Sequence, residues 1–176
     1  MATRHQVREG VASMLYAREI GGESGEFVDE FLGEKKIRND QREYALSLFE
    51  GVNANMDAID RTLNARLGKW KLDEIGAVER AILRLGTYEL LYTDTDTGIV
   101  ISEAVALANE FGSDSATRLI NGVLDAIAKD GSNLKTAEVT LASSEQVTLE
   151  GSRSATAHPS QGVASPRREV KDKGEQ

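Results

Sequence analysis

The stretch GAVERAILRLGTYELLY, residues 76–92, decides the fold. At helical spacing its apolar residues form two separate stripes. One stripe is Val78, Ile82 and Leu85, preceded by Ile75 just before the stretch, and the other is Leu83, Leu90 and Leu91. A helix that is apolar on two sides needs a packing neighbour on each, because each stripe gains free energy only by leaving water. The stretch therefore predicts a helix in the middle of a bundle, with Asp73 as its N-cap.

Helical periodicity continues on both sides of this stretch. We expect helices at about residues 3–20, 26–32, 40–63, 74–92, 99–111 and 114–127. A capping box of Asp40 and Glu43 would begin the third of them, and Gly51 within it is interpreted as a close helix crossing. No convincing strand pattern precedes residue 131. These patterns predict an all-α bundle of six or seven helices.

The chain changes character after residue 130. Residues 131–176 contain both prolines, no aromatic residue and many Ser, Thr, Ala and Gly residues. Two weakly similar tracts, EVTLAS and QVTLEG, would at most form a marginal two-stranded hairpin. We therefore expect residues 1–130 to form the helical domain and residues 131–176 to form a low-complexity, disordered tail.

Composition narrows the classes of function. The formal net charge of the chain is −8. Residues 131–176 carry six positive and six negative charges, which cancel, so the whole net charge of −8 lies on the helical domain. Such a domain repels phosphates on average, and any nucleic-acid contact must be local or shared with a basic partner. The chain has no cysteine, no segment as apolar as a membrane span and no signal-like start, so a cytoplasmic protein is expected. Catalytic, cofactor-binding and metal-binding constellations are also missing, which argues against an enzyme.

The first predicted helix begins with a small basic group. Arg4, His5 and Arg8 flank its apolar stripe, and a helical projection places Tyr16 on the same side. Arginine offers planar donors for phosphates and base edges, and tyrosine offers a stacking face, which together suit single-stranded RNA. From the residues alone the signal is weak, because surface arginines are usually only solvated and the tyrosine could belong to the core.

Four tracts resemble the bacterial transcription antitermination family NusB. They are REGVASMLYAREI (8–20), GAVERAILRLGTYELLY (76–92), ISEAVALANEFGSD (101–114) and LINGVLDAI (119–127). The resemblance covers residues 3–129 in family order and spacing. It implies an all-α fold of two packed helical subdomains with no catalytic activity. It also implies binding of the single-stranded boxA element of ribosomal RNA transcripts jointly with the ribosomal protein NusE. The complex would join RNA polymerase and other Nus factors and support ribosomal RNA transcription and maturation.

The resemblance also assigns roles to individual residues. The RNA contacts that it implies are Arg4, His5, Arg8, Tyr16 and Arg118. The NusE contacts that it implies are Asp73, Glu79 and Asp114. His5 and Gln6 stand where many members have arginine, and Leu119 stands where many have phenylalanine, so a thinner RNA surface is expected. No cofactor is implied.

Other interpretations stay open at this point. Asp73 and Asp114 are also good N-caps, each worth about 1 kcal/mol of helix stability. The domain could be a helical adaptor that binds protein and no RNA. It could also be an RNA-binding appendage related to ribosomal RNA methyltransferases, although no cofactor-binding pattern follows it in the sequence.

Overall fold

The computed structural model describes residues 1–21, 25–111 and 115–131, and they are helical with short connections. Residues 132–176 of the predicted tail at 131–176 lie outside the described residues, as does the predicted cap Asp114, whereas Gly131 is the last residue of the final helix. The elements are α1 (Arg4–Gly21), α2 (Gly25–Glu34), α3 (Asp40–Ala54), α4 (Met56–Asn64), the 3-10 turn η1 (Leu72–Glu74), α5 (Ala77–Tyr92), α6 (Thr97–Phe111) and a last helix at 115–131. The described residues contain no strand, which confirms the all-α prediction.

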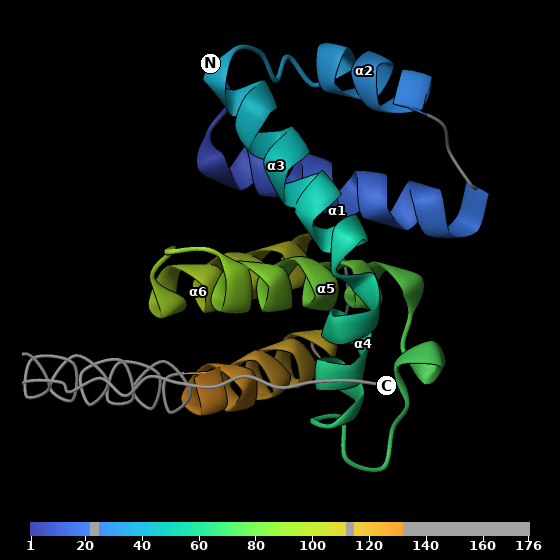
Figure 1. The fold of residues 1–176 in the computed structure, drawn as a ribbon, viewed down its shortest axis with the longest axis vertical. Coiled ribbons are helices and arrows are strands. Elements are labelled where there is room, and N and C mark those ends of the chain that lie inside the picture. Colours follow the sequence, from blue (N-terminus) through green and yellow to red (C-terminus); the bar gives the residue numbers. More distant parts are fainter. Residues whose placement is uncertain (22–24, 112–114, 132–176) are drawn as a thin grey trace, which may run out of the picture. The chain divides into compact units, whose positions relative to one another are not determined.

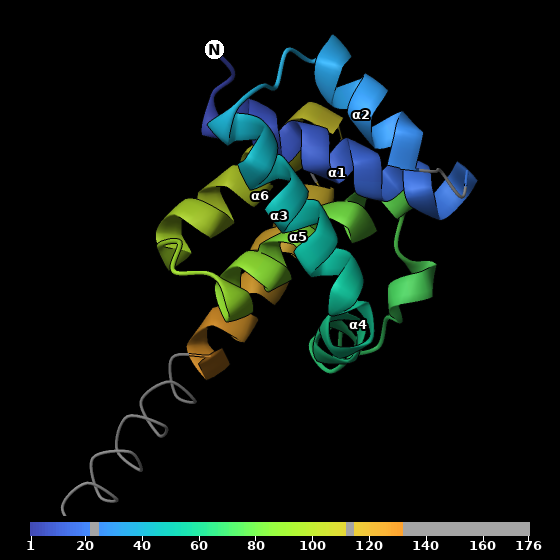
Figure 2. The same ribbon diagram turned by 45° about the horizontal axis from the view of Figure 1, so that its top comes forward.

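Helix α5 occupies the middle of the bundle, as its two apolar stripes require. It packs against α1, α3, α4 and α6. Figure 1 shows α1, α2 and α3 above α5 and α6, with the last helix below them, and Figure 2 shows α3 crossing the bundle. This arrangement agrees with two packed groups of helices. Gly86 of α5 lies against Leu124 of the last helix, where a β-carbon would press on the leucine methyl groups.

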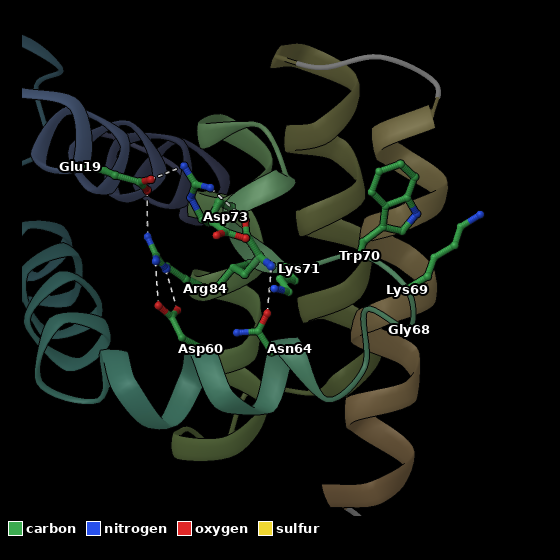
Figure 3. A pocket seen from close by; sticks show the side chains of 11 residues that line it. Glu19, Asp60, Asn64, Gly68, Lys69, Trp70, Lys71, Asp73 and Arg84 are labelled. Carbon is green, nitrogen blue, oxygen red and sulfur yellow. Dashed lines mark hydrogen bonds and ion pairs between the residues drawn. The ribbon is translucent and has the colours of Figure 1, made fainter.

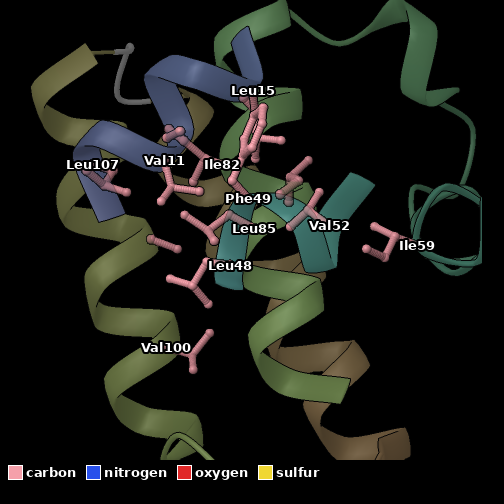
Figure 4. Packing of buried hydrophobic residues seen from close by; sticks show 14 of the residues in the cluster. Val11, Leu15, Leu48, Phe49, Val52, Ile59, Ile82, Leu85, Val100 and Leu107 are labelled. Carbon is pink, nitrogen blue, oxygen red and sulfur yellow. The ribbon is translucent and has the colours of Figure 1, made fainter. Parts of the chain in front are cut away.

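The core fills the space between α1, α3, α5 and α6. Figure 4 shows side chains from these helices converging, with Ile59 of α4 at one end. The members with at most 2 % exposure include Val7, Val11, Met14, Leu48, Val52, Ile59, Leu63, Ile82, Leu83, Leu85, Val100 and Leu107. The predicted stripe of α1 is therefore buried. The two predicted stripes of α5 are buried at Ile82, Leu83, Leu85 and Leu90, and partly buried at Ile75, Val78 and Leu91. Gly51 of α3 packs on the ring and hydroxyl of Tyr88, which confirms the close crossing.

Several predicted helix ends are wrong. The expected helix at 40–63 is two helices, because the chain turns at Asn55, whose side-chain amide donates to the Gly51 carbonyl at 2.8 Å. Asparagine competes in this way for backbone groups and so favours helix ends. Asp40 is the first residue of α3 rather than its cap, and Asn39 precedes it without a capping hydrogen bond. Asp73 lies within η1, and Gly76 is the N-cap of α5.

None of the helices in the described part of the chain combines the length and apolar character that a membrane crossing needs.

Candidate functional site

Arg8 is the first predicted contact residue whose position differs from expectation. It is 4 % exposed and therefore lies inside the protein, between α1 and α5. Its Nε and Nη2 donate to the two carboxylate oxygens of Glu89 at 2.9 and 2.8 Å. The two opposite charges compensate each other, and charged side chains are stable in a low-dielectric interior only when they are paired in this way. Arg8 therefore presents no open donor edge to an external phosphate, and its expected place on the RNA-facing surface is wrong.

The pKa of Arg8 reflects this pairing. Burial alone would lower the pKa of the guanidinium, but the hydrogen bonds and negative charge of Glu89 raise it further above its ordinary value. The sequence carried one signal of this pair: Glu89 is a lone carboxylate within the apolar run of the central helix. Such a residue requires a buried partner, although 81 positions separate it from Arg8.

Tyr44 of α3 joins the same network and was not predicted. Its hydroxyl donates to Glu89 at 3.3 Å and accepts from Arg8 Nη2 at 3.2 Å. Burial, followed by the nearby Glu89 charge, raises the pKa of Tyr44, so the hydroxyl stays protonated and able to donate. On its other side the tyrosine ring carries Arg4, whose guanidinium carbon lies 3.9 Å from the ring centroid. Arg4 itself is exposed, as predicted for a contact residue.

His5 bridges α1 to α6. Its Nδ1 lies 2.8 Å from Glu103 and its Nε2 lies 2.9 Å from Glu110. Both ring nitrogens can donate only in the imidazolium form, so this geometry favours the charged ring. Partial burial lowers the pKa of His5, but the two carboxylates more than offset it, and the pKa is raised from its ordinary value of 6.5. The positive charge of His5 is therefore already matched by two negative charges.

Tyr16 does not lie with Arg4 and His5. It is twelve residues beyond Arg4 on α1, a rise of about 18 Å along the helix. It is half-buried beside an apolar hollow of about 260 Å³, which Val78 and Phe111 also line. The four residues predicted on α1 consequently do not form one face, since one is buried and another lies three turns away.

Glu79 lies next to Val78 in the first turn of α5. It lines a second hollow of about 330 Å³ together with Trp70, Ile75 and Leu119. Trp70 is 52 % exposed and Phe111 is 46 % exposed, which is unusual for large apolar side chains. The first turn of α5 is thus flanked by two apolar hollows, and Tyr16 and Glu79 border them. Arg118 is exposed on the last helix, beside Leu119 in the sequence.

Asp73 is exposed and lines a third hollow, of about 750 Å³. The two arginines that line this hollow, Arg80 and Arg84, are already paired with carboxylates. Arg84 donates to both oxygens of Asp60 at 2.8 Å and to Glu19 at 2.8 Å. Figure 3 shows these pairs together, while Trp70 and Lys69 point away from them. These ion pairs connect α1, α4 and α5. Elsewhere in the described ranges, no group of three His, Cys, Asp or Glu side chains could hold a metal ion.

Comparison with known proteins gives one consistent result. The NusB family model matches residues 5–129. The transcription antitermination protein NusB of Campylobacter fetus is 66 % identical over 129 residues, which is 73 % of this chain and 98 % of that protein. The NusB of a Nitratiruptor species is 54 % identical over 134 residues, covering 76 % of this chain and 96 % of that protein.

Solved structures agree with the sequences. Thermotoga maritima NusB matches with a TM-score of 0.65 at 30 % identity, covering 73 % of this chain and 93 % of that one. A structure of the antitermination factors NusB and NusE in complex with double-stranded RNA matches with a TM-score of 0.67 at 33 % identity. That match covers 72 % of this chain and 96 % of the other.

Proposed function

Because this chain belongs to the NusB family and is a transcription antitermination factor rather than an enzyme, we propose that it binds the boxA element of ribosomal RNA transcripts jointly with the ribosomal protein NusE. The similar structure of NusB and NusE in complex with RNA supports a NusE protein and an RNA as the two binding partners. The boxA sequence and the ribosomal transcripts are our proposal, as is recruitment to RNA polymerase with other Nus factors in the cytoplasm.

The observation that carries the RNA contact is the exposed Arg4 at the start of α1, stacked on Tyr44. His5 is its neighbour and adds a positive charge when RNA displaces one of its carboxylates. Arg118 is proposed as a further phosphate contact from the last helix. Arg8 is left out of the contact set because it is buried. With two or three cationic contacts, the salt slope for single-stranded RNA would be only about −1.4 to −2.

The NusE surface is proposed at the first turn of α5. Glu79 supplies a negative charge at one apolar hollow, which Trp70 also lines, and Tyr16 and Phe111 line the second hollow beside the neighbouring Val78. Exposed aromatic side chains next to a charge are typical anchors of a protein interface. Ribosomal proteins are generally basic, so the acidic helical domain would attract and orient such a partner. Tyr16 fits this surface better than the RNA surface, and Asp73 and Asp114 remain proposed NusE contacts.

No chemical step is involved in this mechanism. The chain offers too little positive charge to hold RNA tightly alone, and the basic partner would complete the RNA-binding surface. Binding of the partner and binding of RNA would therefore strengthen each other.

Two charge reversals test the separation of the surfaces. Arg4→Glu should weaken binding of labelled boxA RNA and leave NusE affinity within about twofold, because Arg4 lies far along α1 from Tyr16. Glu79→Arg should weaken NusE binding in isothermal titration calorimetry. If Arg4→Glu left RNA retention by the complex unchanged, the chain would be a protein-binding adaptor and the RNA assignment would be wrong.

A further inference from the structure

Arg4 is held by an aromatic ring rather than by a carboxylate. Its guanidinium carbon lies 3.9 Å from the centroid of the Tyr44 ring. Within residues 1–21, 25–111 and 115–131, no acidic side chain lies within ion-pair distance of Arg4. His5, the next residue, is in contrast held by two carboxylates. Arg4 thus keeps its charge uncompensated while one face of its planar group is fixed.

The ring beneath Arg4 is itself fixed from inside the protein. Tyr44 comes from α3, and its hydroxyl contacts Glu89 of α5 and Arg8 of α1 at 3.3 and 3.2 Å. Glu89 in turn accepts two hydrogen bonds from Arg8 at 2.9 and 2.8 Å. Arg8 is 4 % exposed and Glu89 is 1 % exposed, so water does not compete for these bonds. Three helices therefore determine where the ring lies.

We propose that Tyr44, oriented by the buried Arg8–Glu89 pair, is a positioning residue that presents Arg4 to RNA. The inference rests on the RNA function proposed above and adds the residue that organises its contact. The inner face of the guanidinium lies on the ring. Its outer face and N–H edge remain open to an unpaired base and to a phosphate. Tyr44 thus acts on RNA binding through Arg4, and the buried Arg8 helps to hold the Tyr44 ring in place.

Positioning has a measurable consequence for affinity. An arginine that is free in solution must lose side-chain freedom when it binds RNA, and a stacked arginine has lost part of it already. Removing the ring should cost an exposed cation–π interaction, which corresponds to about a two- to fivefold loss of RNA affinity. Removing the ring from a chain that lacks the Arg4 guanidinium should cost nothing further.

A double-mutant cycle on the full chain with NusE tests this coupling. Arg4→Ala, Tyr44→Leu and the double variant would be titrated against labelled boxA RNA by fluorescence anisotropy. We expect each single variant to lose about two- to fivefold and the double variant to lose no more than Arg4→Ala alone. Tyr44→Phe, which keeps the ring and loses the hydroxyl, should fall between wild type and Tyr44→Leu.

Controls separate this effect from general damage. Tyr92→Leu removes a half-exposed ring at the end of α5, and Arg61→Ala removes an exposed positive charge on α4; neither should change RNA affinity by more than about 1.5-fold. NusE affinity and thermal unfolding would establish that each variant is folded. If Tyr44→Leu does not unfold the chain but its loss adds fully to that of Arg4→Ala, the positioning role is wrong.

The outcomes distinguish the two proposals. An RNA effect for Arg4→Ala with none for Tyr44→Leu or Tyr44→Phe overturns the positioning role and leaves the RNA surface standing. No RNA effect for Arg4→Ala overturns the RNA surface itself, and the positioning role falls with it.

Discussion

Replacing Arg8 by methionine should lower the free energy of unfolding by about 3 to 5 kcal/mol, the usual cost of breaking a buried ion pair. The Arg8 and Glu89 side chains are 5 % and 2 % exposed. Methionine fills a similar space but cannot donate a hydrogen bond, so Glu89 loses three of its contacts with Arg8 and keeps only the bond from Tyr44. The penalty is that of an uncompensated carboxylate in the interior.

The second variant of the pair gives the matched control. Arg8→Met combined with Glu89→Leu removes both charges, and replacing a buried pair by apolar side chains is often close to neutral. We therefore expect the double variant to recover most of the stability that Arg8→Met loses. The Tyr44 hydroxyl loses its donor Arg8 in both variants and its acceptor Glu89 only in the double variant.

Urea denaturation followed by circular dichroism at 222 nm measures the effect. With a slope of about 2 kcal/mol per molar urea, a loss of this size moves the midpoint by about 1.5 to 2.5 M. A loss below about 1 kcal/mol for Arg8→Met would refute the reasoning, because it would mean that the guanidinium is hydrated in solution. Arg8 would then return to the set of surface residues available to RNA.

Three further predictions concern α3 and the N-terminus of α1. Gly51→Ala places a methyl group against the Tyr88 hydroxyl and should destabilise the fold by about 1 to 3 kcal/mol in the same denaturation assay. The control Gly33→Ala in α2 meets no neighbour, so it should be neutral or stabilising by up to about 1 kcal/mol. The raised pKa of His5 means that its stabilising effect is complete below about pH 6.5 and is lost as pH rises through the higher folded value, so thermal unfolding of wild type and His5→Gln should converge at alkaline pH. Divergence with rising pH would contradict this. Glu110→Gln removes one negative charge next to His5 but keeps an acceptor for its ring, and RNA affinity in anisotropy titrations should rise by about two- to threefold; an unchanged or lower affinity would show that RNA does not approach His5.

Helical periodicity predicted the architecture because it records which side of each helix leaves water. The stripe of Val7, Val11 and Met14 is buried as expected, and α5 is buried on both sides. Helix ends were less predictable, because they depend on single hydrogen bonds. The turn at Asn55 arises from a bond to the Gly51 carbonyl that no periodicity contains.

The candidate site was predictable in part. Arg4 is exposed at the start of α1 as expected, but the same projection could not separate it from Arg8, which lies one turn away at the edge of the stripe. The two arginines differ because Arg8 forms a buried ion pair with Glu89, which lies 81 positions away in the sequence. A tertiary ion pair has no local signature beyond a charge in an apolar run. The sequence therefore located the basic helix but not which of its arginines faces solvent.

The central claim is that this acidic chain binds RNA tightly only together with a basic partner. Anisotropy titration of labelled boxA RNA with the chain alone, NusE alone and both together tests it most directly. We expect NusE to tighten the affinity by roughly 5- to 150-fold, the usual range for coupled sites. Equal affinity with and without NusE, or a steep salt dependence for the chain alone, would contradict it.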